Sequence, residues 1–434
     1  MTSPPPHDLV GQVWNYPLFE ALYGRRSRRF GLGFELPDGP FRYASAQPPV
    51  PLDELEEALL VAAGVGISGL TLWEQTPPLR QRGPDGRTFA STSGGRRTAL
   101  FMSNDSGVHV IDPDGGAADR MRDVETPDAR ARVLALYRDH RKTLRPGRLD
   151  APRRVPPLSA HNLWDWNRPG TTLFMPVCDV SASLISLTAQ FVDGALARFV
   201  APGERGMNIV DDRHGFRPAG TERWLASGFL DPEKVMPLSL LERQASYFMF
   251  SEPAAICQNM FLASEALGIG GWKHCGFLSR EILEALGFRT VVPAGAPSLA
   301  NPIGLDGVFE ARCPPYHRDI DAAVDAVLAP LTRADAMPRP GPSAVAHRLP
   351  GDAYRQHVVT VSDDGIACTK AICRYVLETY GRFPGGIDAM HLMWCFQAHH
   401  LDIDFYDRFF QPGAYGPTHA AHMATWHPEV DQSA

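Results

Sequence analysis

Residues 255–270 read AICQNMFLASEALGIG, a stretch that is typical of a helix with apolar residues on nearly every side. Ser251 is placed to cap this helix, and Pro253 would lie in its first turn. Gly268 follows the last apolar residues and supplies the glycine at which many helices end. A helix that is apolar all round is usually buried. The stretch therefore predicts a globular domain with this helix at its centre.

Other elements can be placed on either side of the central stretch. Ser239 and Glu242 match a capping box, which predicts a separate helix that ends near Phe250. Pro51 can open a helix whose apolar stripe is formed by Leu52, Leu55, Leu59 and Ala62 or Ala63. Further helices are expected over residues 279–286 and 365–380, each followed by glycine, and a strand over 288–292.

One hairpin is expected between Leu100 and Ile111, because apolar residues flank the polar turn 104–107. Helices and strands are thus mixed along the chain without a strict βαβ rhythm. This pattern favours the α+β class over a doubly wound parallel sheet.

Composition excludes several classes of protein. With 434 residues, 44% of them apolar, the chain can bury a sizeable core and is not disordered as a whole. A formal net charge of −7 has the wrong sign for a dedicated nucleic-acid binder. No apolar run has the length of a membrane helix, and the first residues lack a signal-peptide pattern, so a cytoplasmic protein without a membrane partner is expected.

The seven cysteines are odd in number and contain no CxxC pair, which argues against both a disulfide framework and a thiolate zinc site. Most of them are expected to be small buried residues.

Two short segments could bind an anionic ligand. Residues 24–30, GRRSRRF, place four arginines and a serine where they could clamp a phosphate, although a solvated basic turn is the simpler interpretation of this segment alone. Residues 90–97, ASTSGGRR, offer small side chains and backbone N–H groups around Ser93 and Gly94, although a surface loop is the simpler interpretation.

A third segment joins the end of the central helix to the residues behind it. Gln258 and Asn259 are amides on a helix that should be buried, so they need hydrogen-bond partners. Gly268, Ile269 and Gly270 turn the chain tightly, and Lys273 follows in a protein that has only four lysines. A ligand platform and a simple helix end are both consistent with this pattern.

In their order and spacing, these segments resemble the nitroreductase superfamily of flavin enzymes. The RRSxR-type segment of that family is matched by Arg25, Arg26, Ser27 and Arg29. Its helix-exit serine is matched by Ser68, and its late helix and glycine turn by residues 255–270. The spacer before residues 91–95 and the hairpin ending GVHVID, residues 107–112, are closer to the longer branch that includes azoline dehydrogenases of peptide natural products.

The resemblance implies a homodimer of nitroreductase-like α+β fold, with FMN at the interface. Residues 1–330 would form the flavin domain, with an insertion at about 113–235, and residues 331–434 a C-terminal extension packed on it. The cofactor-binding residues carried over or proposed beside the motifs are Arg25, Arg26, Ser27, Arg29, Ser93, Gly94, Gly268, Ile269, Gly270 and Lys273. A positive charge at Lys273 would lie beside the flavin pyrimidine and stabilise the reduced anion.

The chemistry in this family is mostly the cofactor's, so no catalytic acid or base is assigned. We expect an FMN-dependent oxidoreductase that moves hydride through flavin N5 between NAD(P)H, or an organic donor, and a small-molecule acceptor. The alternatives are an azoline-type dehydrogenase, a non-catalytic flavin-fold binding protein, and a metal-dependent enzyme.

The metal alternative rests on the last forty residues, which are rich in histidine and aromatic side chains. His419 and His422 could share a helix face, and His399 or His400 with Asp402 could add ligands for zinc or iron. The spacing matches no standard metal site, and histidines packed in a core are the simpler interpretation, so no metal ligand is assigned. The aromatic content predicts that this tail is docked on the core.

Overall fold

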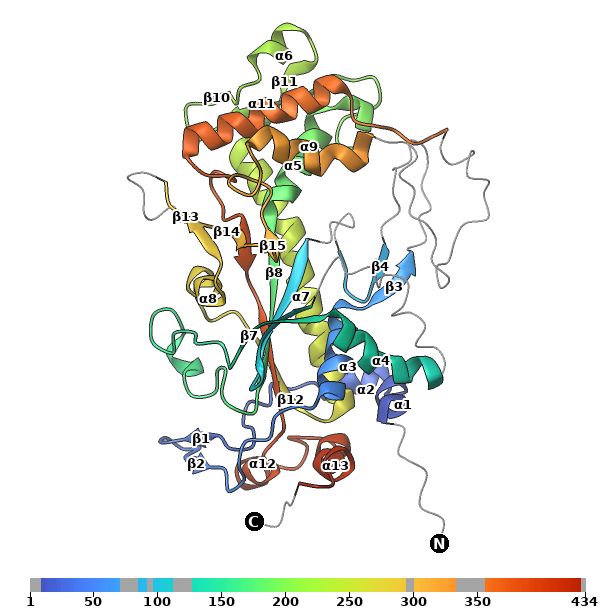
Figure 1. Ribbon diagram of the computed structural model, residues 1–434, viewed down its shortest axis with the longest axis vertical. Helices are drawn as coiled ribbons and strands as arrows, with labels where there is room; N and C mark the ends of the chain where they lie inside the picture. The colour runs from blue at the N-terminus through green and yellow to red at the C-terminus, as the bar shows by residue number, and fades with distance from the viewer. Residues whose placement is uncertain are drawn as a thin grey trace.

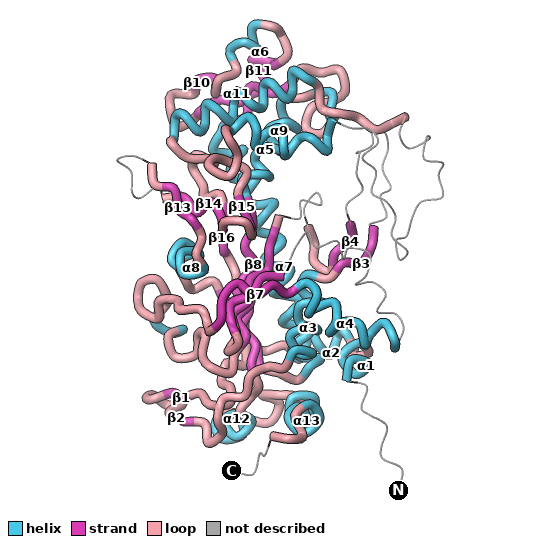
Figure 2. The backbone as a smooth tube through the Cα atoms, in the orientation of Figure 1, coloured by secondary structure: helices cyan, strands magenta, loops and turns pink. Residues whose placement is uncertain are grey.

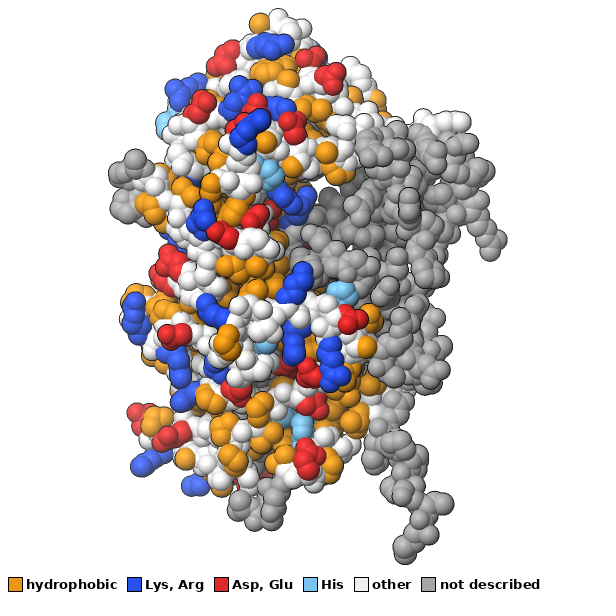
Figure 3. All heavy atoms as spheres, in the orientation of Figure 1, with side chains coloured by type: hydrophobic (Ala, Val, Ile, Leu, Met, Phe, Trp, Pro, Cys, Tyr) orange, Lys and Arg blue, Asp and Glu red, His pale blue; other side chains and the backbone are white. Residues whose placement is uncertain are grey.

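The computed structural model describes residues 9–70, 85–91, 97–111, 127–293, 300–332 and 356–430. Its helices and mainly antiparallel strands confirm the expected α+β class. The molecule is elongated, and one long helix, α7 (Leu238–Leu267), runs lengthwise through its middle (Figure 1). None of the described helices has the length and apolar character needed to cross a membrane. On the face shown in Figure 3, acidic and basic side chains are interspersed.

The central sheet of the described chain has seven strands, and all their pairings are antiparallel. Its middle strand is β8, whose eight residues are all buried. One edge of β8 pairs with β5, and the other pairs with both β16 and β17. The strands are β5 (Thr98–Ser103), β6 (Gly107–Ile111), β7 (Arg141–Pro146), β8 (Thr172–Asp179), β12 (Gly270–His274), β16 (Met390–Leu392) and β17 (Cys395–His399).

Helices cover this sheet and extend beyond both of its ends (Figure 2). They are α1 (Leu9–Trp14), α2 (Leu18–Gly24), α3 (Glu54–Val65), α4 (Pro127–His140), α5 (Val180–Val192), α6 (Glu222–Ala226), α7, α8 (Ser279–Leu286), α9 (Ile320–Leu328), α11 (Asp363–Tyr380), α12 (Ile403–Phe409) and α13 (Pro417–Trp426). The smaller sheets join β1 (Glu35–Leu36) to β2 (Tyr43–Ala44), β3 (Ile67–Leu70) to β4 (Asp85–Arg87), β9 (Gly206–Asp211) to β10 (Arg217–Pro218) and β11 (Leu230–Pro237), and β14 (Asn301–Leu305) to β13 (Arg289–Val291) and β15 (Phe309–Glu310).

The expected boundaries at 113–235 and 331–434 do not appear as breaks in the sheet. Strand β8 comes from the first of these segments, and β16 and β17 come from the second. Both segments therefore contribute to the centre of the fold. Within the described part of the tail, the side chains of Phe405, Tyr406 and Trp426 are buried.

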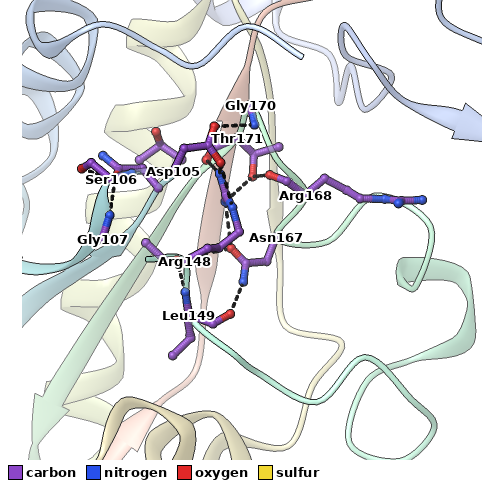
Figure 4. Close-up of polar contacts among 12 residues, drawn as sticks. Asp105, Ser106, Gly107, Arg148, Leu149, Asn167, Arg168, Gly170 and Thr171 are labelled. Carbon is purple, nitrogen blue, oxygen red and sulfur yellow. Dashed lines mark hydrogen bonds and ion pairs between the residues drawn. The ribbon is translucent and has the colours of Figure 1, made fainter. Parts of the chain in front are cut away.

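Several expected elements form as predicted. The hairpin is β5–β6, and Asn104 Oδ1 accepts the backbone N–H groups of Ser106 and Gly107 at its turn. Arg148 fixes this turn to the neighbouring loop, because its guanidinium bonds to both Asp105 and the carbonyl of Thr171 (Figure 4). Helices α8 and α11 end at their predicted glycines, and six of the seven cysteines are buried.

The prediction of two helices between residues 239 and 267 is wrong, because α7 is one continuous helix with Pro253 inside it. The capping box that was expected to open the first of these helices does not form either. Ser239 bonds to Asp212, and Glu242 accepts the backbone N–H groups of Gly385 and Gly386 instead. Packing against the sheet thus outweighs the missing hydrogen bond at Pro253.

The start of α3 also differs from the prediction. The helix begins at Glu54 and not at Pro51, with Asp53 as its N-cap, and the Asp53 carboxylate accepts the N–H groups of Leu55 and Glu56. Glu56 returns the bond by accepting the N–H of Asp53 at 2.6 Å, which completes a capping box. The helix therefore turns Glu56 and Glu57 into the protein. The predicted apolar stripe also packs inward: Leu52 and Leu59 are buried in the core, and Leu55 and Ala62 pack against it.

Glu57 is a buried carboxylate whose hydrogen bonds come from neutral donors, with the Arg141 guanidinium 3.8 Å from its Oε2. Asn104 Nδ2 and Thr172 Oγ1 donate to its Oε1 at 2.8 and 2.7 Å, and Tyr137 donates to Oε2 at 2.6 Å. Burial raises the pKa of Glu57, and the hydrogen bonds oppose that rise. The carboxylate thereby ties α3 to the hairpin, to β8 and to α4.

We expect Tyr137→Phe to lower the free energy of unfolding by about 1–3 kcal/mol, because one oxygen of a buried carboxylate loses its donor. Urea denaturation at neutral pH measures the change. The matched control is Tyr247→Phe, since Tyr247 is 62% exposed and its hydroxyl is free to bond to water. Equal stabilities of the two variants would show that water replaces the Tyr137 hydroxyl.

Candidate functional site

The arginine segment follows α2 and divides into two parts. Arg26 and Ser27 are exposed, and Arg25 is half-buried with its guanidinium 4.9 Å from the ring centre of Phe261. Arg26 Nη1 donates to the carbonyls of Tyr23 and Arg25, which close the C-terminus of α2. No ion pair of Arg25 or Arg26 is found within the described part of the chain. These two cations and the Ser27 hydroxyl are available to a ligand.

Arg28 and Arg29 are instead held by the protein. Arg28 is buried and its Nη1 lies 2.6 Å from Glu265 Oε1. Arg29 makes a two-pronged ion pair with buried Asp165, at 2.6 and 2.8 Å, and stacks 4.0 Å from the ring centre of Trp272. Arg29 therefore anchors the segment, and two of its nitrogens are already bonded within the chain.

The central sheet separates the predicted cations. Trp272 and Lys273 are neighbours on β12, so their side chains point to opposite faces. Lys273 pairs with Phe396 on β17, whose ring contacts Phe261, and the Lys273 ammonium lies 4.7 Å from the ring centre of Trp394. Lys273 therefore lies on the sheet face that packs against α7, and Arg25 lies on the same face because it contacts Phe261. Arg29 lies on the other face, with Trp272.

The predicted glycine turn is closed by the chain itself. Gly268 ends α7 with φ +82°, and a Cβ placed there would lie 2.4 Å from the Thr418 carbonyl oxygen. A Cβ on Gly270 would lie 2.6 Å from Leu401 and 2.7 Å from the His399 ring, and Ile269 is buried. These glycines give room to the C-terminal segment. Ser93 and Gly94 lie outside the described residues.

The two amides that precede this turn are half-buried on α7. Asn259 Nδ2 donates to the carbonyl of Thr88 at 2.7 Å, so one of them joins α7 to the segment after β4.

A second constellation surrounds the buried carboxylate of Glu56. Three imidazoles converge on its Oε1: His400 Nε2 at 2.9 Å, His422 Nε2 at 2.7 Å and His427 Nε2 at 3.1 Å. The four side chains are at most 7% exposed, and their four facing atoms lie within 4.8 Å of one another. Burial would raise the pKa of Glu56, but the surrounding imidazoles, His400 foremost and then His422 and His427, hold that pKa well below its ordinary value.

The outer nitrogens of two of these rings are fixed by backbone carbonyls. His400 Nδ1 lies 3.0 Å from the Val50 oxygen, and His422 Nδ1 lies 2.7 Å from the Leu267 oxygen. Because a carbonyl can only accept, both Nδ1 atoms carry hydrogen and donate. The orientation of each ring is thereby set.

Sequence reasoning anticipated only part of this cluster. His400 and His422 were named as possible ligands, but Asp402 instead caps α12, and His419 lies beside Glu265 at 3.8 Å. The partner carboxylate, Glu56, was missed. The third imidazole, His427, belongs to the histidine-rich tail but was given no ligand role. Glu56 lies 344 residues before His400, and the sequence signal available was only the pairing of Asp53 with Glu56 in a capping box.

Comparisons with known proteins add little. No family model matches the sequence, and no curated protein matches it. Among solved structures, the chain is similar to a crystal structure from Ralstonia eutropha that is provisionally named a nitroreductase, with 15% identity and a TM-score of 0.28 over 63% of this chain and 76% of that chain. A TM-score of that size does not establish a common fold.

We expect Arg29→Ala to lower the free energy of unfolding by about 3–5 kcal/mol, because it leaves the buried Asp165 carboxylate without its cation. Chemical denaturation measures this loss. Arg26→Ala, on the exposed part of the same segment, should cost less than about 1 kcal/mol. If both variants were equally stable, Arg29 would not be the anchor of the segment.

We also expect His274 to make the protein less stable in acid. Its ring stacks on Trp272, neither nitrogen has a hydrogen-bond partner among the described residues, and burial followed by the charge of Arg29 lowers its pKa to about 3. Between its unfolded pKa near 6.5 and about 3, only the unfolded state binds the proton. Stability therefore falls by up to about 1.4 kcal/mol per unit as the pH drops through this range.

His274→Phe keeps an aromatic ring on Trp272 and removes this titration. Urea denaturation of both proteins at several values between pH 7 and pH 5 should give a smaller loss for the variant. Parallel curves would mean that His274 is protonated in the folded state.

Proposed function

We propose that the protein is an FMN-dependent oxidoreductase of nitroreductase type. The observation that supports it best is that Arg25 and Arg26, beside the exposed Ser27 hydroxyl, form no ion pair with any described residue. An anionic phosphate fits such a site, because guanidinium groups and a hydroxyl supply charge-assisted hydrogen bonds. The Arg28–Glu265 and Arg29–Asp165 ion pairs fix the residues that follow Ser27 to the rest of the protein.

The residues fit one end of FMN and not the other. Arg25, Arg26 and Ser27 fit the phosphate, and Lys273 lies on the same side of the sheet as Arg25. The turn of Gly268, Ile269 and Gly270 does not fit the flavin ring, because His399, Leu401 and Thr418 occupy the space beside it. Arg29 is engaged on the opposite face. We therefore retain Arg25, Arg26, Ser27 and Lys273 as FMN contacts of this chain.

When bound, FMN supplies hydride transfer at its N5 atom. The chain's own part is to bind and orient it: the two arginines and Ser27 fix the phosphate, and the Lys273 ammonium favours negative charge near it. The donor is NAD(P)H or an organic molecule, and the acceptor is a small molecule. Oxidation of an azoline ring in a peptide natural product is the variant of this function that the longer-branch resemblance favours.

A homodimer in the cytoplasm completes the proposal. The surface immediately before Arg25 supports the dimer, since Leu18, Phe19 and Tyr23 of α2 are 62%, 70% and 78% exposed. Exposed apolar groups of this kind mark contact surfaces. A partner subunit on α2 would lie next to the arginine segment, where the family resemblance places FMN.

We expect the purified protein to carry FMN or to take it up, and Arg25→Ala/Arg26→Ala to bind it at least about tenfold more weakly. Each charge-assisted hydrogen bond lost is worth about 1.5–3 kcal/mol. Flavin fluorescence titration measures the affinity, and circular dichroism verifies that the variant is folded. Arg318→Ala is the matched control, because Arg318 is an arginine with 85% exposure.

Two results would overturn the proposal: a wild-type protein that neither contains nor takes up FMN, or a double variant that retains it with unchanged affinity. Bleaching of the bound flavin by NADH or NADPH separates an enzyme that uses a nicotinamide from one that takes hydride directly from its organic substrate. A flavin that no donor reduces would identify a binding protein.

A further inference from the structure

We propose that Glu56, His400, His422 and His427 bind one divalent transition-metal ion, with zinc the best match, and that this ion fastens the C-terminal segment to α3. Imidazole nitrogen and carboxylate oxygen are ligands that zinc takes in four-coordinate sites. Each side chain presents a single atom to a common centre, and all four are buried. The proposal concerns a different site from the arginine segment and does not rest on flavin binding.

The hydrogen bonds of the outer ring nitrogens carry the argument. The Nδ1 atoms of His400 and His422 donate to carbonyl oxygens, so in the neutral rings the Nε2 atoms hold lone pairs. Both lone pairs then face Oε1 of Glu56, which as a carboxylate is also only an acceptor. An arrangement of acceptors that point at one another is unfavourable unless a cation lies among them.

Extra protons are the competing explanation. They would place up to three imidazolium charges around one carboxylate, at side chains that are 0%, 2% and 7% exposed for His400, His422 and His427. Such an excess of buried like charge is costly. A single metal ion satisfies all three nitrogens while the rings stay neutral, and the carbonyls of Val50 and Leu267 orient two of the rings as outer partners commonly do in metal sites.

The carboxylate has one oxygen available for the ion. Glu56 Oε2 accepts the backbone N–H of Asp53 at 2.6 Å, which leaves Oε1 as a single ligand atom. Tetrahedral zinc with bonds of about 2.0–2.2 Å needs ligand atoms roughly 3.3 Å apart. The observed contacts from Oε1, 2.7–3.1 Å, are somewhat shorter than that spacing, and all four ligand atoms lie within 4.8 Å of one another, so binding would move the rings slightly apart from Oε1 around the ion.

The position of the ion implies a structural role. Four protein ligands fill a tetrahedral shell, whereas catalytic zinc keeps one position for water. The ligands come from the start of α3, the residue after β17, α13 and the C-cap of α13. Binding would therefore join segments that are far apart in the sequence and hold α13 over Gly268.

The test is metal analysis of the wild-type chain, prepared without a histidine tag. We expect one equivalent of zinc after desalting, and a lower melting temperature once a strong chelator has removed it. Cobalt added to the stripped protein should give the visible absorption of a tetrahedral site. No bound metal, no cobalt spectrum and no effect of the chelator would together overturn the proposal in favour of a protonated cluster.

Variants locate the ion. His422→Gln should weaken cobalt and zinc binding at least about tenfold, since even the outer partners of metal ligands contribute that much. His419→Gln is the matched control: His419 is a buried histidine one turn earlier on α13, outside the cluster. Equal metal affinity in the two variants would overturn the assignment. If His422→Gln does not fold, His427→Gln, at the more exposed C-cap, provides the same comparison.

The readout separates this inference from the proposed function. Metal content and the cobalt spectrum do not depend on flavin, and FMN binding is measured on Arg25→Ala/Arg26→Ala with the histidines intact. A chain that binds zinc and no FMN would support the metal site alone.

Discussion

The buried carboxylate of Glu56 is the group on which the lower half of the structure depends. It lies in the first turn of α3. Its Oε2 accepts the backbone N–H of the helix N-cap, and its Oε1 contacts three imidazoles from the last thirty-one described residues. A buried charge of this kind is tolerated only when its partners are in place. The arrangement of α3, the end of β17 and α13 is therefore coupled through one oxygen atom.

That coupling extends to the arginine segment. Helix α13 carries His422 toward Glu56 and His419 toward Glu265, and Glu265 holds Arg28. The same helix covers Gly268, so the turn that resembles a flavin platform serves here as the seat of the C-terminal segment. A glycine that a sequence resemblance places beside a ligand can equally well be required because another stretch of backbone packs closely against it.

Local patterns in the sequence were sufficient for much of the fold. The hairpin, α8, α11 and the glycine at the end of α7 depend on turn and cap chemistry within a few residues. Prediction failed where distant contacts decide. Pro253 stays in a continuous helix because of packing, and Glu242 serves Gly385 and Gly386 instead of a cap. For the site, the sequence motif grouped Arg25 with Arg29. In the structure the two arginines lie on opposite faces of the sheet, because Arg29 stacks on Trp272, whose side chain points away from that of its neighbour Lys273.

The histidines of the tail show why composition alone does not assign a centre. Three of the four residues of the cluster lie in the tail, but the fourth, Glu56, lies far away in the sequence, where a carboxylate after a proline-rich stretch is ordinarily interpreted as part of a helix cap. Asp53 and Glu56 do form that cap, but the cap uses only Oε2 of Glu56. Its other oxygen is aimed into the protein, where two imidazoles of fixed tautomer present lone pairs to it. Since acceptors do not attract acceptors, the meeting of these two ring nitrogens with the Glu56 oxygen is favourable only with a positive charge between them, and an ion at the centre of the cluster supplies that charge while the rings stay neutral.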